Sequence, residues 1–131
     1  MEVKRVTPVL YVEEIEPCLS FWVDRLGFRK TAEVPDGNKL AFVSLQHGST
    51  EIMFQTFASQ EKDIPGWSKQ FRGSTFLYIE VVKLDDILAA LRGVEPEVPE
   101  RTTFYGAREI GYKDPAGHVA LFAEFSQAPQ H

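Results

Sequence analysis

The feature of this sequence that most restricts its fold is an internal repeat with an offset of 69 residues. A strand-like segment over 6–12 is followed by apolar residues at helical spacing, and the same order returns from residue 75 onward. Helical spacing alone could coincide, but two glycine pairs keep the same register, which indicates a duplicated unit. The residues that meet at this offset are Leu10 and Ile79, Val12 and Val81, Ile15 and Leu84, Leu19 and Leu88, Trp22 and Leu91, Gly37 and Gly106, Gly48 and Gly117, and Ile52 and Leu121.

Each unit is expected to contain a strand, a helix and then three strands. Pro17 suits the first turn of the first helix, Gly27 suits its end, and Gly93 ends the second helix. Turn residues separate the later segments of alternating apolar residues, which predicts strands there. These strands are expected at 29–34, 40–45 and 50–55 in the first unit, and at 94–98, 108–113 and 119–125 in the second.

The predicted architecture is a single α+β domain over 1–131, with two βαβββ units at about 5–56 and 74–126. The two units are expected to form a curved mixed sheet around a cleft, with the helices on its outer side. The segment 57–73 contains Pro65 and Gly66, so it is expected to be a linking loop with at most one short helical turn. A sheet with an open concave side forms a cleft for a small-molecule ligand.

Composition narrows the function classes. A chain of 131 residues can bury a hydrophobic core without a metal or a disulfide. Its net charge of −5 disfavours nucleic-acid binding and is compatible with a cationic small molecule. No apolar run approaches the roughly 20 residues of a membrane helix, and no signal-peptide cleavage site is recognisable, so we expect a cytoplasmic protein. The single cysteine, Cys18, is expected to be buried and unreactive.

Two segments carry a resemblance to a known family. They are TPVLYVEEIEPCLSFWVDRLGF at 7–28 and GAREIGYKDPAGHVALFAE at 106–124. Together with the βαβββ duplication, they resemble the vicinal oxygen chelate superfamily of glyoxalases, ring-cleaving dioxygenases and bleomycin resistance proteins. The bleomycin resistance proteins are the most similar branch, since Pro8, the FW-DRLGF run and the Asp114–Gly117 turn all resemble theirs.

The resemblance also locates the metal positions of the family, which lie on four strands and usually hold His, Gln or Glu. A metal needs imidazole or carboxylate donors, and the corresponding residues here supply none as a set. We therefore expect no metal, no other cofactor and no catalytic residue. Carried over by motif and by the repeat, these positions are Thr7, Ile52, Phe76 and Leu121.

Other metal donors are not expected to replace that set. Glu51, Gln55 and Glu124 lie beside the carried-over positions, but strand alternation is expected to turn them onto the opposite face. His47 and His118 flank predicted turns, and are expected to be ordinary surface or turn histidines.

Strand alternation and loop aromatics predict the ligand-binding side chains. Flat aromatic walls with a few polar groups suit a planar, partly cationic ligand. The alternatives are core filling or dimer packing for the loop rings, and a solvated carboxylate for Glu80. The predicted ligand-binding residues are Tyr11, Ile52, Phe54, Trp67, Phe76, Tyr78, Glu80, Phe104 and Tyr105.

These expectations favour non-catalytic binding of a bulky aromatic or cationic small molecule, resembling antibiotic sequestration by the bleomycin resistance proteins. Two alternatives remain: a small-molecule enzyme of the same superfamily, and a carrier or immunity protein unrelated to drugs. The resemblance also implies a homodimer in which the N-terminal strand is exchanged between chains. The segment 3–12 has no tight hairpin to a neighbouring strand, which leaves it free to pair with a second copy.

Overall fold

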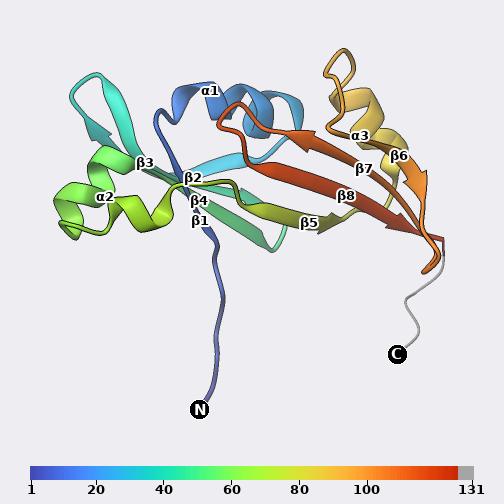
Figure 1. Ribbon diagram of the computed structural model, residues 1–131, viewed down its shortest axis with the longest axis horizontal. Helices are drawn as coiled ribbons and strands as arrows, with labels where there is room; N and C mark the ends of the chain where they lie inside the picture. Colours follow the sequence, from blue (N-terminus) through green and yellow to red (C-terminus); the bar gives the residue numbers. More distant parts are fainter. Residues whose placement is uncertain (127–131) are drawn as a thin grey trace. The chain divides into compact units, whose positions relative to one another are not determined.

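The computed structural model describes residues 1–126, which form two compact units, one over Met1–Gly73 and the other from Ser74 onward (Figure 1). The α+β class and the two βαβββ units are confirmed, and each unit has its own four-stranded mixed sheet. Unit 1 contains β1 (Val9–Val12), α1 (Glu16–Leu19), η1 (Ser20–Arg25), β2 (Arg29–Asp36), β3 (Lys39–His47), β4 (Thr50–Thr56), α2 (Phe57–Asp63) and η2 (Ser68–Phe71). Unit 2 contains β5 (Phe76–Glu80), α3 (Leu84–Ala90), β6 (Val98–Thr102), β7 (Ala107–Lys113) and β8 (Val119–Phe125).

Both sheets follow the same strand order. Unit 1 has the order β1-β4-β3-β2 and unit 2 the order β5-β8-β7-β6, each with one parallel pair at the edge and antiparallel pairs beyond it. The glycine pair Gly48 and Gly117 has φ angles of 60° and 91°, which glycine adopts at no steric cost in the turn before the last strand. The repeat in the sequence therefore corresponds to a repeat of topology.

The core of unit 1 lies between its sheet and the first helix. Alternate residues of β1 and β4 point to this side, where Trp22 of the π-helical segment η1 has no exposed surface. The Trp22 ring lies 5.4 Å from Phe28 and 6.0 Å from Phe54 between centroids. Cys18 on the preceding helix α1 is buried, as expected. We call this side of each sheet the helix face and the other side the opposite face.

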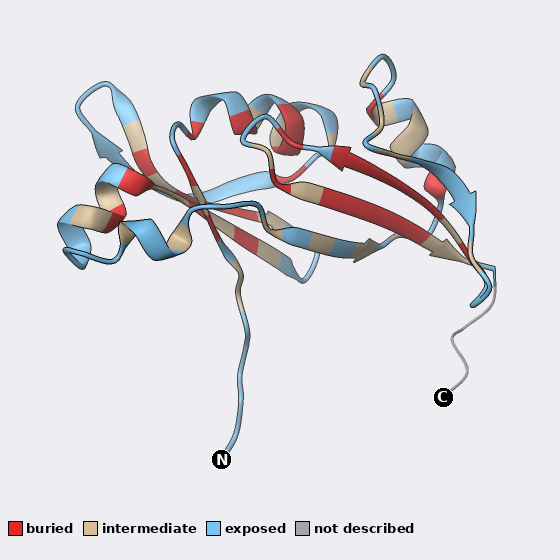
Figure 2. Cartoon of the chain, in the orientation of Figure 1, coloured by how far each residue is buried: buried red, intermediate tan, exposed pale blue. Residues whose placement is uncertain are grey.

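Unit 2 repeats this arrangement with α3 (Figure 2). Leu84 at the start of α3 is buried, and its backbone N–H donates to the Glu124 carboxylate at 2.6 Å. Glu124 therefore lies on the helix face together with Phe122, and caps a helix end instead of facing a ligand, as the strand alternation predicted. Within residues 1–126, no helix is long and apolar enough to cross a membrane.

Three predicted segments differ from the structure. The segment 57–73 is not merely a loop, because it forms α2 and the 3-10 helix η2 and belongs to unit 1. The Thr56 hydroxyl accepts the Ser59 N–H at 3.1 Å and so caps the start of α2. The second strand of unit 2, β6, begins at Val98, where a strand over 94–98 was expected. The first strand begins at Val9, three residues later than expected.

The offset of the repeat changes at the last strand of each unit. Val9 pairs with Met53 in unit 1 and Tyr78 pairs with Leu121 in unit 2, so the offset is 69 residues in the first strand and 68 in the last. The paired residues of the first and last strands are 44 positions apart in unit 1 and 43 in unit 2, because the connections between them differ in length. Two residues separate the paired positions His47 and Thr50, whereas five separate Lys113 and Val119. A shift by one residue moves every side chain of a strand to the other face.

Candidate ligand-binding site

The shift corrects the prediction for β4. Ile52 and Phe54 do not lie on the same face as Thr7 and Tyr11: their exposed fractions are 3% and 0%, and Phe54 packs toward Trp22 on the helix face. Glu51, Met53 and Gln55 occupy the opposite face, which reverses the expected orientation of Glu51 and Gln55. The matched glycines Gly48 and Gly117 led to the wrong alignment, because they lie in hairpin loops of different length.

Glu51 is the centre of a polar cluster on the opposite face of unit 1. Its carboxylate accepts hydrogen bonds from the Ser44 hydroxyl at 3.0 Å and the Thr7 hydroxyl at 3.1 Å, and Arg5 lies 3.4 Å away. The hydrogen bonds from Ser44 and Thr7 hold the pKa of the Glu51 carboxyl below its ordinary value. Thr7 therefore lies beside a carboxylate, that of Glu51, which occupies the position where Ile52 was expected.

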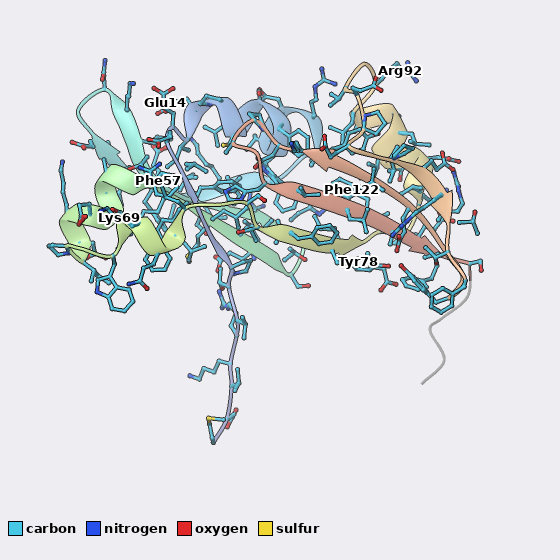
Figure 3. All side chains as sticks on the ribbon, in the orientation of Figure 1. Glu14, Phe57, Lys69, Tyr78, Arg92 and Phe122 are labelled. Atoms are coloured by element: carbon cyan, nitrogen blue, oxygen red, sulfur yellow. The ribbon has the colours of Figure 1, made fainter. Side chains whose placement is uncertain are left out.

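An aromatic cluster connects β1 with α2 and η2 in unit 1. The Tyr11 ring stacks on Phe71 with centroids 4.7 Å apart, and Phe71 in turn lies 6.4 Å from Trp67. Phe57, labelled in Figure 3, flanks Tyr11 at 6.3 Å and carries the Arg72 guanidinium 4.2 Å above its ring. Tyr11 and Trp67, both predicted from the sequence, thus belong to one stack of rings. Trp67 is at its exposed end, with 48% of its surface accessible.

The opposite face of unit 2 presents a row of three predicted residues on the edge strand β5. Phe76 is 60% exposed, Tyr78 is 47% exposed, and Glu80 is also exposed. They alternate with Leu77 and Ile79, which point to the helix face. Within residues 1–126 the Glu80 carboxylate makes no hydrogen bond or ion pair. Two rings and a free carboxylate are therefore available to solvent along this strand.

A buried carboxylate, Glu109 of β7, organises this face. Its side chain has no exposed surface, yet it accepts four hydrogen bonds. One oxygen, Oε2, accepts the hydroxyls of Tyr78 at 2.6 Å and Tyr105 at 2.5 Å. The other, Oε1, accepts Nε and Nη2 of Arg101 at 3.0 and 2.8 Å. These charge-assisted bonds satisfy a charge that would otherwise be costly to bury.

The cluster shifts the acidity of its own members. Burial by itself raises the pKa of the Glu109 carboxyl, but the hydrogen bonds from Tyr105, Tyr78 and Arg101 outweigh burial and hold that pKa below its ordinary value. Burial and the hydrogen bond to Glu109 raise the pKa of the Tyr78 phenol well above its ordinary value. At neutral pH Glu109 is therefore ionised beside the charged Arg101 guanidinium, and the Tyr78 phenol is neutral.

The tip of the β6–β7 connection adds two further rings. Phe104 is fully exposed, and its ring lies edge-on to Tyr105 with centroids 5.1 Å apart. Tyr105 also lies 6.2 Å from Phe125. The structure thus brings Tyr78, Phe104 and Tyr105 together in unit 2, in contact through Glu109 or through one another.

Sequence reasoning missed Glu109 and Arg101. Their sequence signal was weak, because Glu109 lies in a segment with charged neighbours, and nothing in the sequence marks it as a carboxylate without exposed surface. Cross-strand pairing provides the missing information: Arg101 pairs with Glu109, Glu109 with Ala123, and Ala123 with Glu80. One row across the sheet therefore contains both the buried and the free carboxylate.

The donor set does not fit a divalent metal. Correcting the register replaces Ile52 by Glu51, which adds one carboxylate to the hydroxyl of Thr7. In unit 2 the corresponding positions remain Phe76 and Leu121, which have no donor atom. Within residues 1–126, no group of three or more His, Cys, Asp or Glu side chains is arranged to hold a metal ion.

His118 has a structural contact that the sequence did not predict. It is buried, so it is not a surface histidine, and its Nδ1 accepts the Thr75 N–H at 2.9 Å. The Asp114 carboxylate accepts the N–H groups of Ala116 and His118, which fixes the turn before β8. His118 therefore joins the starts of β5 and β8, and the motif DPAGH is explained by folding alone.

Comparison with known proteins establishes the family. Residues 4–122 match the Glyoxalase/Bleomycin resistance protein/Dioxygenase superfamily, so the chain belongs to it, as its sequence resemblance implied. No curated protein matches significantly. The class of protein is thus fixed by the fold and by the family match together.

Solved structures share the fold at low sequence identity. The bleomycin-binding protein of Streptomyces verticillus, complexed with copper(II)-bleomycin, is 23% identical over 97% of this chain and 99% of its own, with a TM-score of 0.65. An antibiotic binding protein from a Streptomyces species is 21% identical over 96% and 99%, with a TM-score of 0.71. Lactoylglutathione lyase from Agrobacterium tumefaciens is 14% identical over 95% and 96%, with a TM-score of 0.75. The same fold thus occurs in binding proteins and in an enzyme.

Proposed function

We propose that this protein binds a flat aromatic, positively charged small molecule without transforming it, as an antibiotic-sequestering protein does. The observation that carries the proposal is the row of Phe76, Tyr78 and Glu80, which presents two rings and an unpaired carboxylate on one exposed strand. Rings of this kind stack on planar ligands and attract cations through their electron-rich faces. The net charge of −5 attracts the same class of ligand.

Local electrostatics support a cationic ligand over an anionic one. The positive groups of this face are Arg101 and Lys113, which form ion pairs with Glu109 and Glu97. Glu80 remains as an uncompensated negative charge in the same row of the sheet. Trp67 and Tyr11 in unit 1 form a second aromatic surface of the same chemistry, for which we propose the same role in stacking.

A second candidate is an enzyme of the same superfamily. It is favoured by one observation, the Glu51 carboxylate beside Thr7, which places one acidic group at a position where family enzymes hold a metal. Against it stand Phe76 and Leu121, which cannot donate to a metal. We therefore place binding first and metal-dependent catalysis second.

Thermal melting tests the two candidates together. We expect copper(II)-bleomycin or the planar cation proflavine to raise the melting temperature, because a ligand that binds only the native state stabilises it. Zinc or nickel ions alone should leave the melting temperature unchanged. A stoichiometric bound metal, accompanied by turnover of the hemithioacetal of methylglyoxal and glutathione, would replace the binding proposal by the enzyme.

Matched variants locate the binding surface. Phe76→Ala and Glu80→Gln should weaken proflavine binding, whereas Glu100→Gln should not, because Glu100 is an exposed carboxylate of β6 that pairs with Arg108. If wild-type protein binds none of these ligands, or if Phe76→Ala and Glu80→Gln bind proflavine as the wild type does, the proposed surface is wrong.

A further inference from the structure

The side chain of Tyr78 does not project freely from its strand. Tyr78 is on β5 and Glu109 is on β7, and β8 lies between them in the sheet. Neighbouring strands are about 4.8 Å apart, so the two side chains must reach toward each other across β8 to form their 2.6 Å hydrogen bond. Leu121 and Ala123 of β8 lie in these rows and are buried. Tyr78, labelled in Figure 3, is thus held over the sheet while 47% of its surface remains accessible.

The hydrogen bonds also change the rings electronically. A phenol that donates a short hydrogen bond to a carboxylate is polarised toward phenolate, which increases the electron density of its ring. A cation above an electron-rich ring face is attracted more strongly. Tyr78 and Tyr105 donate to the same oxygen of Glu109, so one carboxylate acts on both rings.

The arrangement indicates why a charged group is buried here. A carboxylate without exposed surface contributes little net stability compared with an apolar residue of similar volume. Its partners, however, are three side chains that are each about half exposed: Tyr78, Tyr105 and Arg101, the last at 55%. Glu109 fixes all three from beneath, and itself remains out of reach of a ligand.

We propose that Glu109 is the positioning residue of the unit 2 site, which holds Tyr78 and Tyr105 as a rigid, electron-rich platform for a planar aromatic cation. The inference rests on the proposed function, and adds to it the residue that sets the preference for cations. Arg101 is the countercharge that allows Glu109 to be buried, and it has no required contact with the ligand.

Two tricyclic probes of similar outline test the platform: proflavine, a cation at pH 8, and acridine, which is neutral at that pH. Tyr78→Phe removes only the hydroxyl that contacts Glu109 and leaves every charge in place. We expect it to lower the affinity for proflavine by roughly three- to tenfold, and that for acridine by less, because one polarised ring is lost. Glu109→Gln should lower the affinity for proflavine by about tenfold and that for acridine by less, because the polarisation of the Tyr78 and Tyr105 rings is lost.

A matched control and an independent readout complete the experiment. Tyr112→Phe removes a tyrosine hydroxyl from the buried helix face of the same sheet and should leave both affinities unchanged. Ultraviolet titration of tyrosinate should show one tyrosine ionising at lower pH in Glu109→Gln than in wild type, a change that a purely structural role would not produce. If Glu109→Gln does not fold, Tyr78→Phe and Tyr105→Phe provide the same test.

The outcomes separate this inference from the proposed function. If wild-type protein binds proflavine but the folded Tyr78→Phe, Tyr105→Phe and Glu109→Gln variants bind it equally well, Glu109 has no positioning role and the proposed function stands. If wild-type protein binds neither probe, the proposed function and this inference are both wrong.

Discussion

The exposed rings of Trp67 and Tyr78 are each held by contacts with neighbouring residues. Trp67 ends a stack that continues through Phe71 to Tyr11, and Tyr78 ends in a hydrogen bond to Glu109. The two rings have almost the same exposed fraction, 48% and 47%, but different supports. Replacing them should therefore have similar effects on a ligand and different effects on stability.

Trp67→Ala should weaken binding of proflavine by about 1 kcal/mol while leaving the free energy of unfolding nearly unchanged. Tyr78→Ala should weaken binding similarly and also cost about 1–2 kcal/mol of stability, because Glu109 loses one of its hydrogen bonds. Fluorescence titration and urea unfolding measure the two quantities. Large losses of stability with normal binding in both variants would mean that the rings are core residues and the ligand binds elsewhere.

The lowered pKa of Glu109 predicts a dependence of stability on acid. Its carboxyl is more acidic in the folded protein than in the unfolded chain, so ionised Glu109 stabilises the fold above the ordinary glutamate pKa of 4.5. This stabilisation is lost as the pH falls through the lower, folded pKa. Urea unfolding between pH 6 and pH 2 should therefore show a steeper loss for wild type than for Glu109→Gln. Equal slopes would contradict the assignment.

At the scale of elements, β4 shows how a shift of one residue in register decides the role of a strand. The two-residue connection between β3 and β4 turns Glu51, Met53 and Gln55 away from the helix, whereas the longer connection in unit 2 leaves Leu121 on the face of Tyr78. The alternation itself was correct in both strands. The prediction of which β4 residues point to each face was wrong, because that depends on hairpin geometry and not on composition.

Adjacent alanine substitutions in β4 test this register. Phe54→Ala should destabilise the protein by about 3–5 kcal/mol, since the ring is fully buried and a cavity would remain beside Trp22. Met53→Ala, on the opposite face, should cost about 1 kcal/mol. Chemical denaturation measures both. A larger loss of stability for Met53→Ala than for Phe54→Ala would show that the orientation expected from the repeat is correct.

At the scale of the whole molecule, the N-terminal segment concerns assembly. Residues 1–6 are exposed and precede β1 as an extended stretch that points away from the sheet of unit 1 (Figure 1). Val3 and Val6 are among the exposed large apolar residues, and β1 is an edge strand. Exposed edges and apolar segments of this kind favour pairing with another chain.

We expect a homodimer, with the N-terminal strand exchanged between the two chains. Light scattering at micromolar concentration should give twice the chain mass of 14.9 kDa. A variant lacking residues 1–6 should shift toward the mass of one chain if that segment holds the dimer together. A wild-type mass near 15 kDa would exclude the dimer, and a truncated variant that remains dimeric would exclude the exchange.

The sequence by itself determined the class of this protein and the order of its strands and helices along the chain. The repeat of apolar residues and the Gly48 and Gly117 turns predicted two βαβββ units, and the family resemblance carried by 7–28 and 106–124 is confirmed. Local signals suffice for these features, because helix periodicity, strand alternation and turn residues act over a few positions. The same signals correctly placed Phe76, Tyr78 and Glu80 on one face of their strand.

Only the tertiary structure decided which residues meet. The Glu109 cluster joins side chains from β5, β6, β7 and the β6–β7 connection, and its members are 4 to 31 positions apart in the chain. The orientation of Ile52, Phe54 and Glu51 likewise depended on a hairpin loop and on pairing with β1. Burial and cross-strand partners are properties of the assembled sheet, so a one-residue change of register can exchange a core residue for a site residue without any change in the local pattern.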